Sequence, residues 1–131
     1  MMMAPTFRKQ ERIVSHQLIE TLFEKGDSQT LAAYPLRAVF LQTERQQGHA
    51  PIQILISVPK KRFHHAVDRN RVKRQIREAY RKNKWLIYDA LPADKQLLLA
   101  FVWLSDRHLP SAEVEHRVVS LLQRVAEEQK K

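Results

Sequence analysis

The side chains best suited to chemistry in this sequence are those of Lys and Arg, and their surplus is confined to one segment. Between Lys60 and Lys84 the chain carries eleven Lys or Arg residues against Asp68 and Glu78, whereas the remainder of the 131 residues holds twelve basic and twelve acidic ones. The formal net charge of +9 therefore belongs to this segment. A charged surface that served only solubility would mix its signs along the chain. The segment indicates a localised site for a polyanionic partner.

A helix is expected in this segment, from Ala66 or Asp68 to Lys82, with Asp68 as its N-terminal cap. At about 100° per residue its apolar residues fall on one side: Val72, Ile76, Ala79 and Tyr80. Within an arc of roughly 100° on the opposite side fall the polar and cationic residues: Asn70, Lys73, Arg74, Arg77 and Arg81. Arg69 and Arg71 flank this face at the first turn, where free backbone N–H groups also favour phosphate.

Two interpretations of this helix face compete, namely anion binding and a merely solvated surface. Like charges three or four residues apart destabilise an isolated helix by roughly 0.2–0.5 kcal/mol per pair. The carboxylate of Glu78 is expected to offset this repulsion chiefly at Arg74, one turn earlier. Arg also outnumbers Lys on the face, and its planar guanidinium suits bidentate contacts with phosphate and base edges. We therefore favour binding over the solvated surface.

The other elements must hold this helix against a core. Ser15 is expected to cap a first helix that ends before Gly26 and whose apolar residues share one face: Leu18, Ile19, Leu22 and Phe23. Strands are expected at residues 29–33, 36–42, 52–58 and 96–104, the last one apolar throughout and therefore central and buried. Alternation within 52–58 predicts a sheet with one face free to meet something polar.

A short helix is expected within residues 84–91, ended by Pro92, and a final helix opens at Pro110 and Ser111. The apolar residues of the final helix form one core stripe: Val114, Val118, Leu121, Leu122 and Val125. The order αβββαβα predicts an α+β sandwich. The length of the chain predicts a single domain over residues 1–131, in which residues 1–6 are expected to be disordered.

Composition excludes several functional classes. The chain has no Cys, so it has no disulfide, thiolate metal site or Cys nucleophile. Residues 1–12 lack the apolar run of a signal peptide, and the longest apolar stretch, 97–104, is too short to span a bilayer. We therefore expect a cytoplasmic protein without a membrane partner. The six His residues lack ligand spacing, and no carboxylate cluster suits the two Mg²⁺ ions of a protein nuclease. His64 and His65 are expected to add phosphate contacts.

The stretch from Arg69 to Glu78, RNRVKRQIRE, resembles the R-N-x-x-K-R-x-x-R-E signature of the bacterial ribonuclease P protein component, with every defined position filled. The segments Ser57 to Lys61 and Phe7 to Ile13 are also similar to family segments, so the resemblance covers nearly the whole chain. It implies a ribosomal-protein-S5-domain-2-like fold with a left-handed βαβ crossover, an exception to the right-handed rule.

The resemblance also implies a function, that of the accessory subunit of an RNA-based endoribonuclease that matures the 5′ end of tRNA. The residues implied to dock on the catalytic RNA are Arg69, Asn70, Arg71, Lys73, Arg74, Arg77 and Arg81. The single-stranded 5′ leader of precursor tRNA would lie in a cleft between the first helix and the sheet, for which the candidate residues are Phe7, Phe23, Ser57, Lys60 and Lys61. Aromatic and cationic groups suit unpaired RNA of variable sequence. In this family the RNA cuts and holds most of the Mg²⁺, so we expect neither a catalytic residue nor a tightly bound cofactor in this chain.

Two other function classes fit part of the sequence. A ribosomal or assembly protein would explain the basic helix equally well, and restored cleavage by ribonuclease P RNA at low Mg²⁺ would separate it from the accessory subunit. A DNA-binding regulator would need a helix-turn-helix, whereas here a strand and a loop precede the basic helix. We therefore do not expect DNA as a partner.

Overall fold

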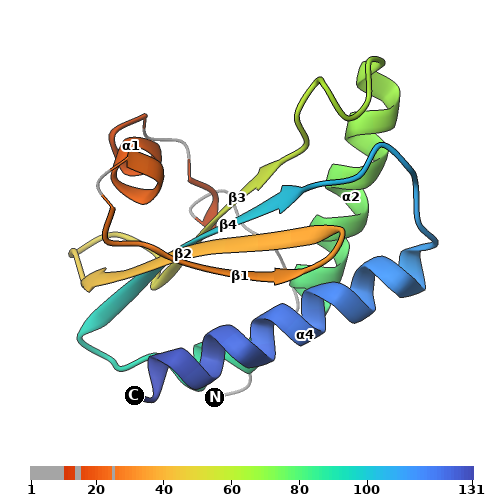
Figure 1. The fold of residues 1–131 in the computed structure, drawn as a ribbon. Coiled ribbons are helices and arrows are strands. Elements are labelled where there is room, and N and C mark those ends of the chain that lie inside the picture. Colours follow the sequence, from red (N-terminus) through yellow and green to blue (C-terminus); the bar gives the residue numbers. More distant parts are fainter. Residues whose placement is uncertain (1–10, 14–15, 25) are drawn as a thin grey trace.

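The computed structural model describes residues 11–13, 16–24 and 26–131, whose arrangement is shown in Figure 1. Its elements are α1 (His16–Glu24), β1 (Gln29–Ala33), β2 (Leu36–Glu44), β3 (Ile52–Ser57), α2 (Ala66–Asn83), α3 (Trp85–Tyr88), β4 (Lys95–Trp103) and α4 (Ser111–Gln129). The predicted order and the α+β class are confirmed, with α3 as the short helix before Pro92. Residues 1–6, Phe7 and Ser15 lie outside the described residues.

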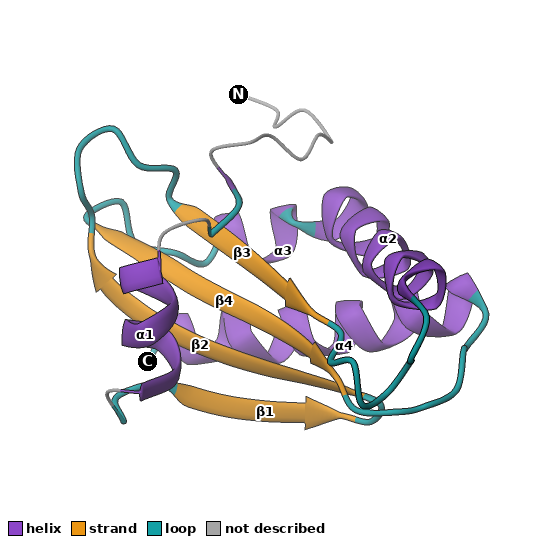
Figure 2. Cartoon of the chain, turned by 90° about the horizontal axis from the view of Figure 1, so that it is seen from above, coloured by secondary structure: helices purple, strands orange, loops and turns teal. Residues whose placement is uncertain are grey.

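The four strands form one sheet in the order β1-β2-β4-β3. Strand β2 is antiparallel to β1 and β4, while β3 and β4 are parallel. Because β4 is paired on both sides and covered on both faces, residues 96–103 are all buried, as its apolar sequence predicted. Helix α2 connects β3 to β4 on the face opposite α1, and the crossover is left-handed (Figure 2). The implied exception to the right-handed rule is thus present.

The main core lies between the sheet and the layer of α2 and α4. Its largest fully buried side chains include Trp103, Tyr80 and Phe101. The predicted stripe of α2 is confirmed, since Val72, Ile76, Ala79 and Tyr80 are its buried residues. The predicted stripe of α4 is confirmed as well, because all five of its residues are fully buried.

The second face of the sheet is covered over part of its area. Leu22 of α1 and Ile13 are buried against Val39, Leu98 and Ala100, so α1 lies across this face (Figure 2). Side chains that remain partly exposed on it include those of residues 37 and 57, which flank Val102 in the strand register. The open face that the alternation of β3 predicts is therefore reduced to the area that α1 leaves uncovered.

The loop between β3 and α2 is fixed by the first turn of α2. The Nη1 of Arg69 donates hydrogen bonds to the carbonyl oxygens of Phe63 (2.9 Å) and His64 (3.0 Å). The Phe63 ring stacks on the His108 ring with 4.5 Å between centroids. Because Phe63 is also buried in the main core, the loop is anchored before the helix begins.

The predicted cap of α2 is wrong. The helix begins at Ala66, so its cap position is His65, which forms no side-chain cap hydrogen bond. Asp68 therefore lies inside the first turn, where its Oδ1 is 3.0 Å from Nε2 of His108. The carboxylate still favours the positive end of the helix dipole, but its partner is a side chain of the β4–α4 loop.

A buried ion pair fastens the segment 11–13 to the helical layer. The Nζ of Lys84 lies 3.0 Å from both carboxylate oxygens of Glu11, and the two side chains are only 6% and 7% exposed. Tyr88 donates its hydroxyl to Glu11 at 3.3 Å. Burial raises the pKa of Tyr88 well above its usual range, so the phenol stays a donor. The N–H of Ile13 donates to the carbonyl of Ile54 at 2.8 Å, which places the segment along the outer edge of β3.

Substitution of Glu11 by Gln should lower the free energy of unfolding by about 3 kcal/mol or more, because Lys84 would keep a buried charge without its counter-ion. The double variant Glu11→Leu/Lys84→Met should recover much of the loss, since it removes both charges together. Urea denaturation followed by circular dichroism measures both. A loss below about 0.5 kcal/mol for Glu11→Gln would show that the ion pair does not hold the segment in solution.

Substitution of Arg69 by Gln should lower the free energy of unfolding by roughly 1–3 kcal/mol, because two loop carbonyls lose a charged donor. Backbone amides of residues 58–65 should also exchange hydrogen faster, which mass spectrometry can resolve by peptide. The matched control is Arg74→Gln on the exposed side of the same helix, for which we expect a change within about 0.5 kcal/mol. Equal stability of the two variants would contradict a structural role for Arg69.

Candidate nucleic-acid interface

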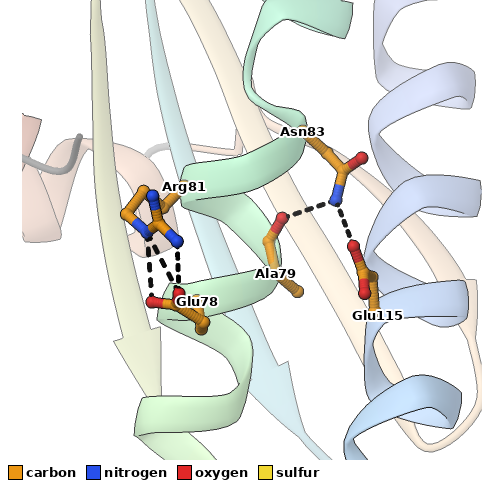
Figure 3. Close-up of polar contacts among 5 residues, drawn as sticks. All are labelled: Glu78, Ala79, Arg81, Asn83 and Glu115. Atoms are coloured by element: carbon orange, nitrogen blue, oxygen red, sulfur yellow. Dashed lines mark hydrogen bonds and ion pairs between the residues drawn. The ribbon is translucent and has the colours of Figure 1, made fainter. Parts of the chain in front are cut away.

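The rotation of α2 about its own axis is fixed by two amide side chains that reach α4 and the loop before it. The Nε2 of Gln75 donates to the carbonyl of Leu109 (3.0 Å) and to the hydroxyl of Ser111 (3.1 Å). The Nδ2 of Asn83 donates to a carboxylate oxygen of Glu115 at 3.0 Å (Figure 3). These bonds and the buried stripe turn one side of α2 towards α4 and the sheet, so its opposite side points outward.

The outward side carries most of the residues predicted to bind RNA. We name it the α2 face and define it by Asn70, Arg71, Lys73, Arg74 and Arg77. Four of its side chains are exposed and that of Lys73 is partly buried. Within residues 11–13, 16–24 and 26–131, these five side chains form no hydrogen bond or ion pair. The four cations therefore stand side by side without an internal counter-ion, which favours an external anion.

Arg81, also predicted to bind RNA, is engaged by Glu78. Its Nε lies 3.1 and 3.2 Å from the two carboxylate oxygens, and its Nη2 contacts the same group (Figure 3). The hydrogen bond from Arg81 lowers the pKa of Glu78, so the carboxylate stays ionised at neutral pH. The prediction that Glu78 chiefly offsets the charge of Arg74 is therefore wrong. Side chains of a helix lean towards its N-terminus, so Arg81 leans over Glu78 while Arg74 leans away from it.

Arg69 differs from the α2 face as well, because its guanidinium is turned to the loop carbonyls described above. The seven residues expected to bind the catalytic RNA are thus divided by the structure. Five form the outward α2 face, Arg69 holds the loop and Arg81 holds a carboxylate. The sequence pattern placed all seven on or beside one face, but it could not show which side chains find a partner within the chain.

A groove of about 220 Å³ borders the α2 face at the outer edge of β3. It is lined by Lys73 and Arg77 of α2, by Ile54, Leu55 and Ile56 of β3, and by Arg12 and Ile13 of the N-terminal segment. Arg12 was not among the predicted binding residues. Its segment belongs to the resemblance at Phe7 to Ile13, but sequence spacing carries no signal that brings this segment to the same groove as α2.

The residues predicted to contact the leader lie on separate elements. Phe23 on α1 is 41% exposed, Ser57 ends β3, and Lys60 and Lys61 are exposed in the loop that follows. Figure 2 shows α1 across the opposite end of the sheet from the end of β3, so the structure does not bring Phe23 and Ser57 into contact. The predicted Phe7 lies outside the described residues.

Arg37 is a further candidate on this face. It is paired in the strand register with Val102, which is also the register partner of Ser57. The Nε of Arg37 is buried and has no hydrogen-bond partner among the described residues. Alternation within β2 could have placed Arg37 on this face, beside Val39, once the face covered by α1 was known.

A metal centre formed by protein side chains is not found in the described part of the chain, which contains no group of three or more His, Asp or Glu residues able to hold an ion. His64 and His65 are exposed in the basic loop, their ring centroids 5.3 Å apart. His108, in the loop between β4 and α4, contacts Phe63 and Asp68. None of the helices in the same residues is long and apolar enough to cross a membrane.

Solved structures with the same fold are RNase P proteins. The protein from Thermotoga maritima matches with a TM-score of 0.62 and 22% identity, over 87% of this chain and 96% of that one. The protein from Staphylococcus aureus matches with a TM-score of 0.67 and 18% identity, over 88% and 94%. These likenesses extend over nearly the whole of each chain and confirm the fold.

Sequence relatives lead to the same family. A curated ribonuclease P protein component from Porphyromonas gingivalis (strain W83) is 41% identical over 93% of this chain and 89% of its own length. One from Chlorobium phaeobacteroides is 32% identical over 89% and 85%. The family model described as Ribonuclease P matches residues 7–126. This chain therefore belongs to the bacterial ribonuclease P protein component family.

Proposed function

We propose that this chain is the protein subunit of ribonuclease P and that it binds the catalytic RNA through the α2 face. The observation that carries the proposal is the outward α2 face, whose four cations have no internal counter-ion among the described residues. A folded RNA supplies phosphates at a spacing that such a face can contact. Membership of the family supports this partner over a ribosomal or assembly role.

Electrostatics gives the α2 face its affinity. Each phosphate that a Lys or Arg neutralises releases condensed counterions, which favours binding and makes it depend on salt. Arg71, Arg74 and Arg77 add planar guanidinium groups that can contact two phosphate oxygens at once. Arg81 would contribute less than these three, because a phosphate must compete with the carboxylate of Glu78.

The 5′ leader of precursor tRNA is proposed to run over the second face of the sheet, from Phe23 towards Ser57, Lys60 and Lys61. Partial exposure of the Phe23 ring leaves it able to stack on a base. Arg37 lies level with Ser57 in the sheet, on the other side of Val102, and its buried Nε has no partner among the described residues. Such contacts read no particular sequence, which suits leaders that vary from one tRNA to the next.

Cleavage itself is assigned to the RNA. Mg²⁺ prefers hard oxygen ligands and keeps several waters, and RNA phosphates supply such oxygens in quantity. The protein would assist by neutralising phosphates where the leader and the catalytic RNA meet, which lowers their mutual repulsion. As a subunit of an enzyme of tRNA maturation, the chain would act in the bacterial cytoplasm.

Substitution of Arg74 or Arg77 by Gln should weaken binding to the catalytic RNA and flatten its salt dependence. The slope of log K against log salt should fall in magnitude by about 0.9 for each phosphate that the variant no longer neutralises. Fluorescence anisotropy with labelled RNA at several KCl concentrations measures both quantities. The control Lys130→Gln removes an equal charge from the exposed C-terminal end of α4 and should leave the slope nearly unchanged. An unaltered slope for Arg74→Gln would count against the α2 face.

Reconstitution with cognate catalytic RNA and precursor tRNA tests the function as a whole. The wild-type chain should restore cleavage at low Mg²⁺, where the RNA alone is slow. Phe23→Ala should weaken binding of a precursor with a leader by roughly tenfold, the effect of removing one base stack, while a leaderless tRNA should bind as before. No stimulation of cleavage would favour a ribosomal or assembly protein. An equal loss of affinity for both tRNAs would show that Phe23 does not contact the leader.

A further inference from the structure

We propose that the groove beside β3 holds one unpaired nucleotide of the RNA that this chain binds. Its phosphate would lie against Lys73 and Arg77, and its base against the apolar wall formed by Ile13 and residues 54–56. The inference rests on the proposed function, because it needs an RNA docked on α2. The α2 face could attract RNA by charge alone, so a nucleotide subsite in the groove is an additional claim.

The groove is formed by three parts of the chain that are far apart in sequence. The segment 11–13 pairs with β3 in a parallel bridge between Arg12 and Ile54. Glu11 and Ile13 are both buried, Glu11 against Lys84 of the helical layer and Ile13 in the small core under α1, while Arg12 between them is exposed. The buried contact of Glu11 with Lys84 holds this geometry. Arg12 is therefore held at the groove that Lys73 and Arg77 of α2 also line.

Backbone groups of β3 also point towards this groove. The carbonyl of Pro51 accepts from Leu97 at the start of β4, whereas the carbonyl of Ile54 accepts from Ile13 on the opposite edge. Successive residues of a strand direct their N–H and C=O groups to opposite edges. The N–H and C=O of Ile56 therefore point to the same outer edge as those of Ile54. A donor and an acceptor at this edge can meet the hydrogen-bonding edge of a base.

The size and lining of the groove decide its occupant. Pockets for drug-sized ligands typically hold about 300–1,000 Å³, so about 220 Å³ suits a single base, with its phosphate at the cationic rim, better than a whole drug-sized metabolite. Apolar side chains beside cations match a flat base attached to a phosphate. Two of the cations belong to the α2 face, so a nucleotide in the groove is continuous with RNA docked there. A base within a duplex cannot reach the groove, which is why the nucleotide is unpaired.

Site-directed photo-crosslinking tests the proposal, because the chain has no Cys and a single introduced Cys can carry the reagent. Ile56→Cys places it in the groove, Val67→Cys at the exposed start of α2 reports docking without altering the α2 face, and Gln123→Cys is an exposed control on α4. In the complex with cognate catalytic RNA, position 56 should crosslink to one or two adjacent unpaired nucleotides, and position 123 to none. Crosslinks from position 67 but none from position 56, or only to paired nucleotides, would overturn the groove and leave the proposed function intact. Loss of RNA binding by all variants and by the wild type would overturn the function itself.

A second measurement pairs a change in the RNA with a change in the groove. An abasic site at the crosslinked nucleotide should weaken binding by the wild type about tenfold, as expected for one stacked base. It should have almost no effect on Ile56→Trp, in which the indole fills the groove. Circular dichroism establishes that this variant is folded, and if it is not, Ile56→Phe, whose smaller ring also occupies the groove, serves in its place with the same expected loss of the abasic effect. An abasic effect equal in the wild type and in a folded Ile56→Trp would show that the base does not enter the groove.

Discussion

Burial of the apolar stripe of α2 is the interaction on which the candidate interface depends. Its larger members, Val72, Ile76 and Tyr80, are fully buried, and burial of side chains of this size contributes about 1.5–3 kcal/mol each. Repulsion between like charges along the α2 face opposes helix formation by only roughly 0.2–0.5 kcal/mol per pair. Burial therefore outweighs the repulsion, and the helix holds its cations outward without any bound partner. The stripe thus orients the charge.

The signature stretch from Arg69 to Glu78 combines two kinds of residue. Arg74 and Arg77 present charge to the outside, whereas Arg69 donates to the carbonyls of the preceding loop. Gln75, within the same stretch, bonds the beginning of α4. A sequence motif of this kind therefore contains residues that position the helix as well as residues available to contact a partner. Loss of function on substitution within it therefore needs a stability measurement before it is assigned to binding.

The N-terminal segment links the two faces of the molecule. Ile13 belongs to the small core under α1, while Glu11 reaches the helical layer through Lys84, which is 73 positions away in the sequence. A lone buried charge would be strongly unfavourable, so the burial of either Glu11 or Lys84 requires the other as its counter-ion. The consequence is a defined place for Arg12 beside the α2 face, which extends the cationic surface from one helix to the edge of the sheet.

The elements, their order and the two sides of α2 could be predicted from the sequence, because helical and strand periodicity are local properties of each segment. The left-handed crossover came from the resemblance and not from periodicity. Four features came from the folded chain alone: Asp68 pairs with His108, Glu78 pairs with Arg81, α1 covers part of the sheet, and Arg12 lines the same groove as Lys73. These features depend on contacts between side chains whose positions follow from the packing of the whole chain. No spacing along the sequence encodes such contacts, since they are set by rotamers, by the start of a helix and by the register of distant segments.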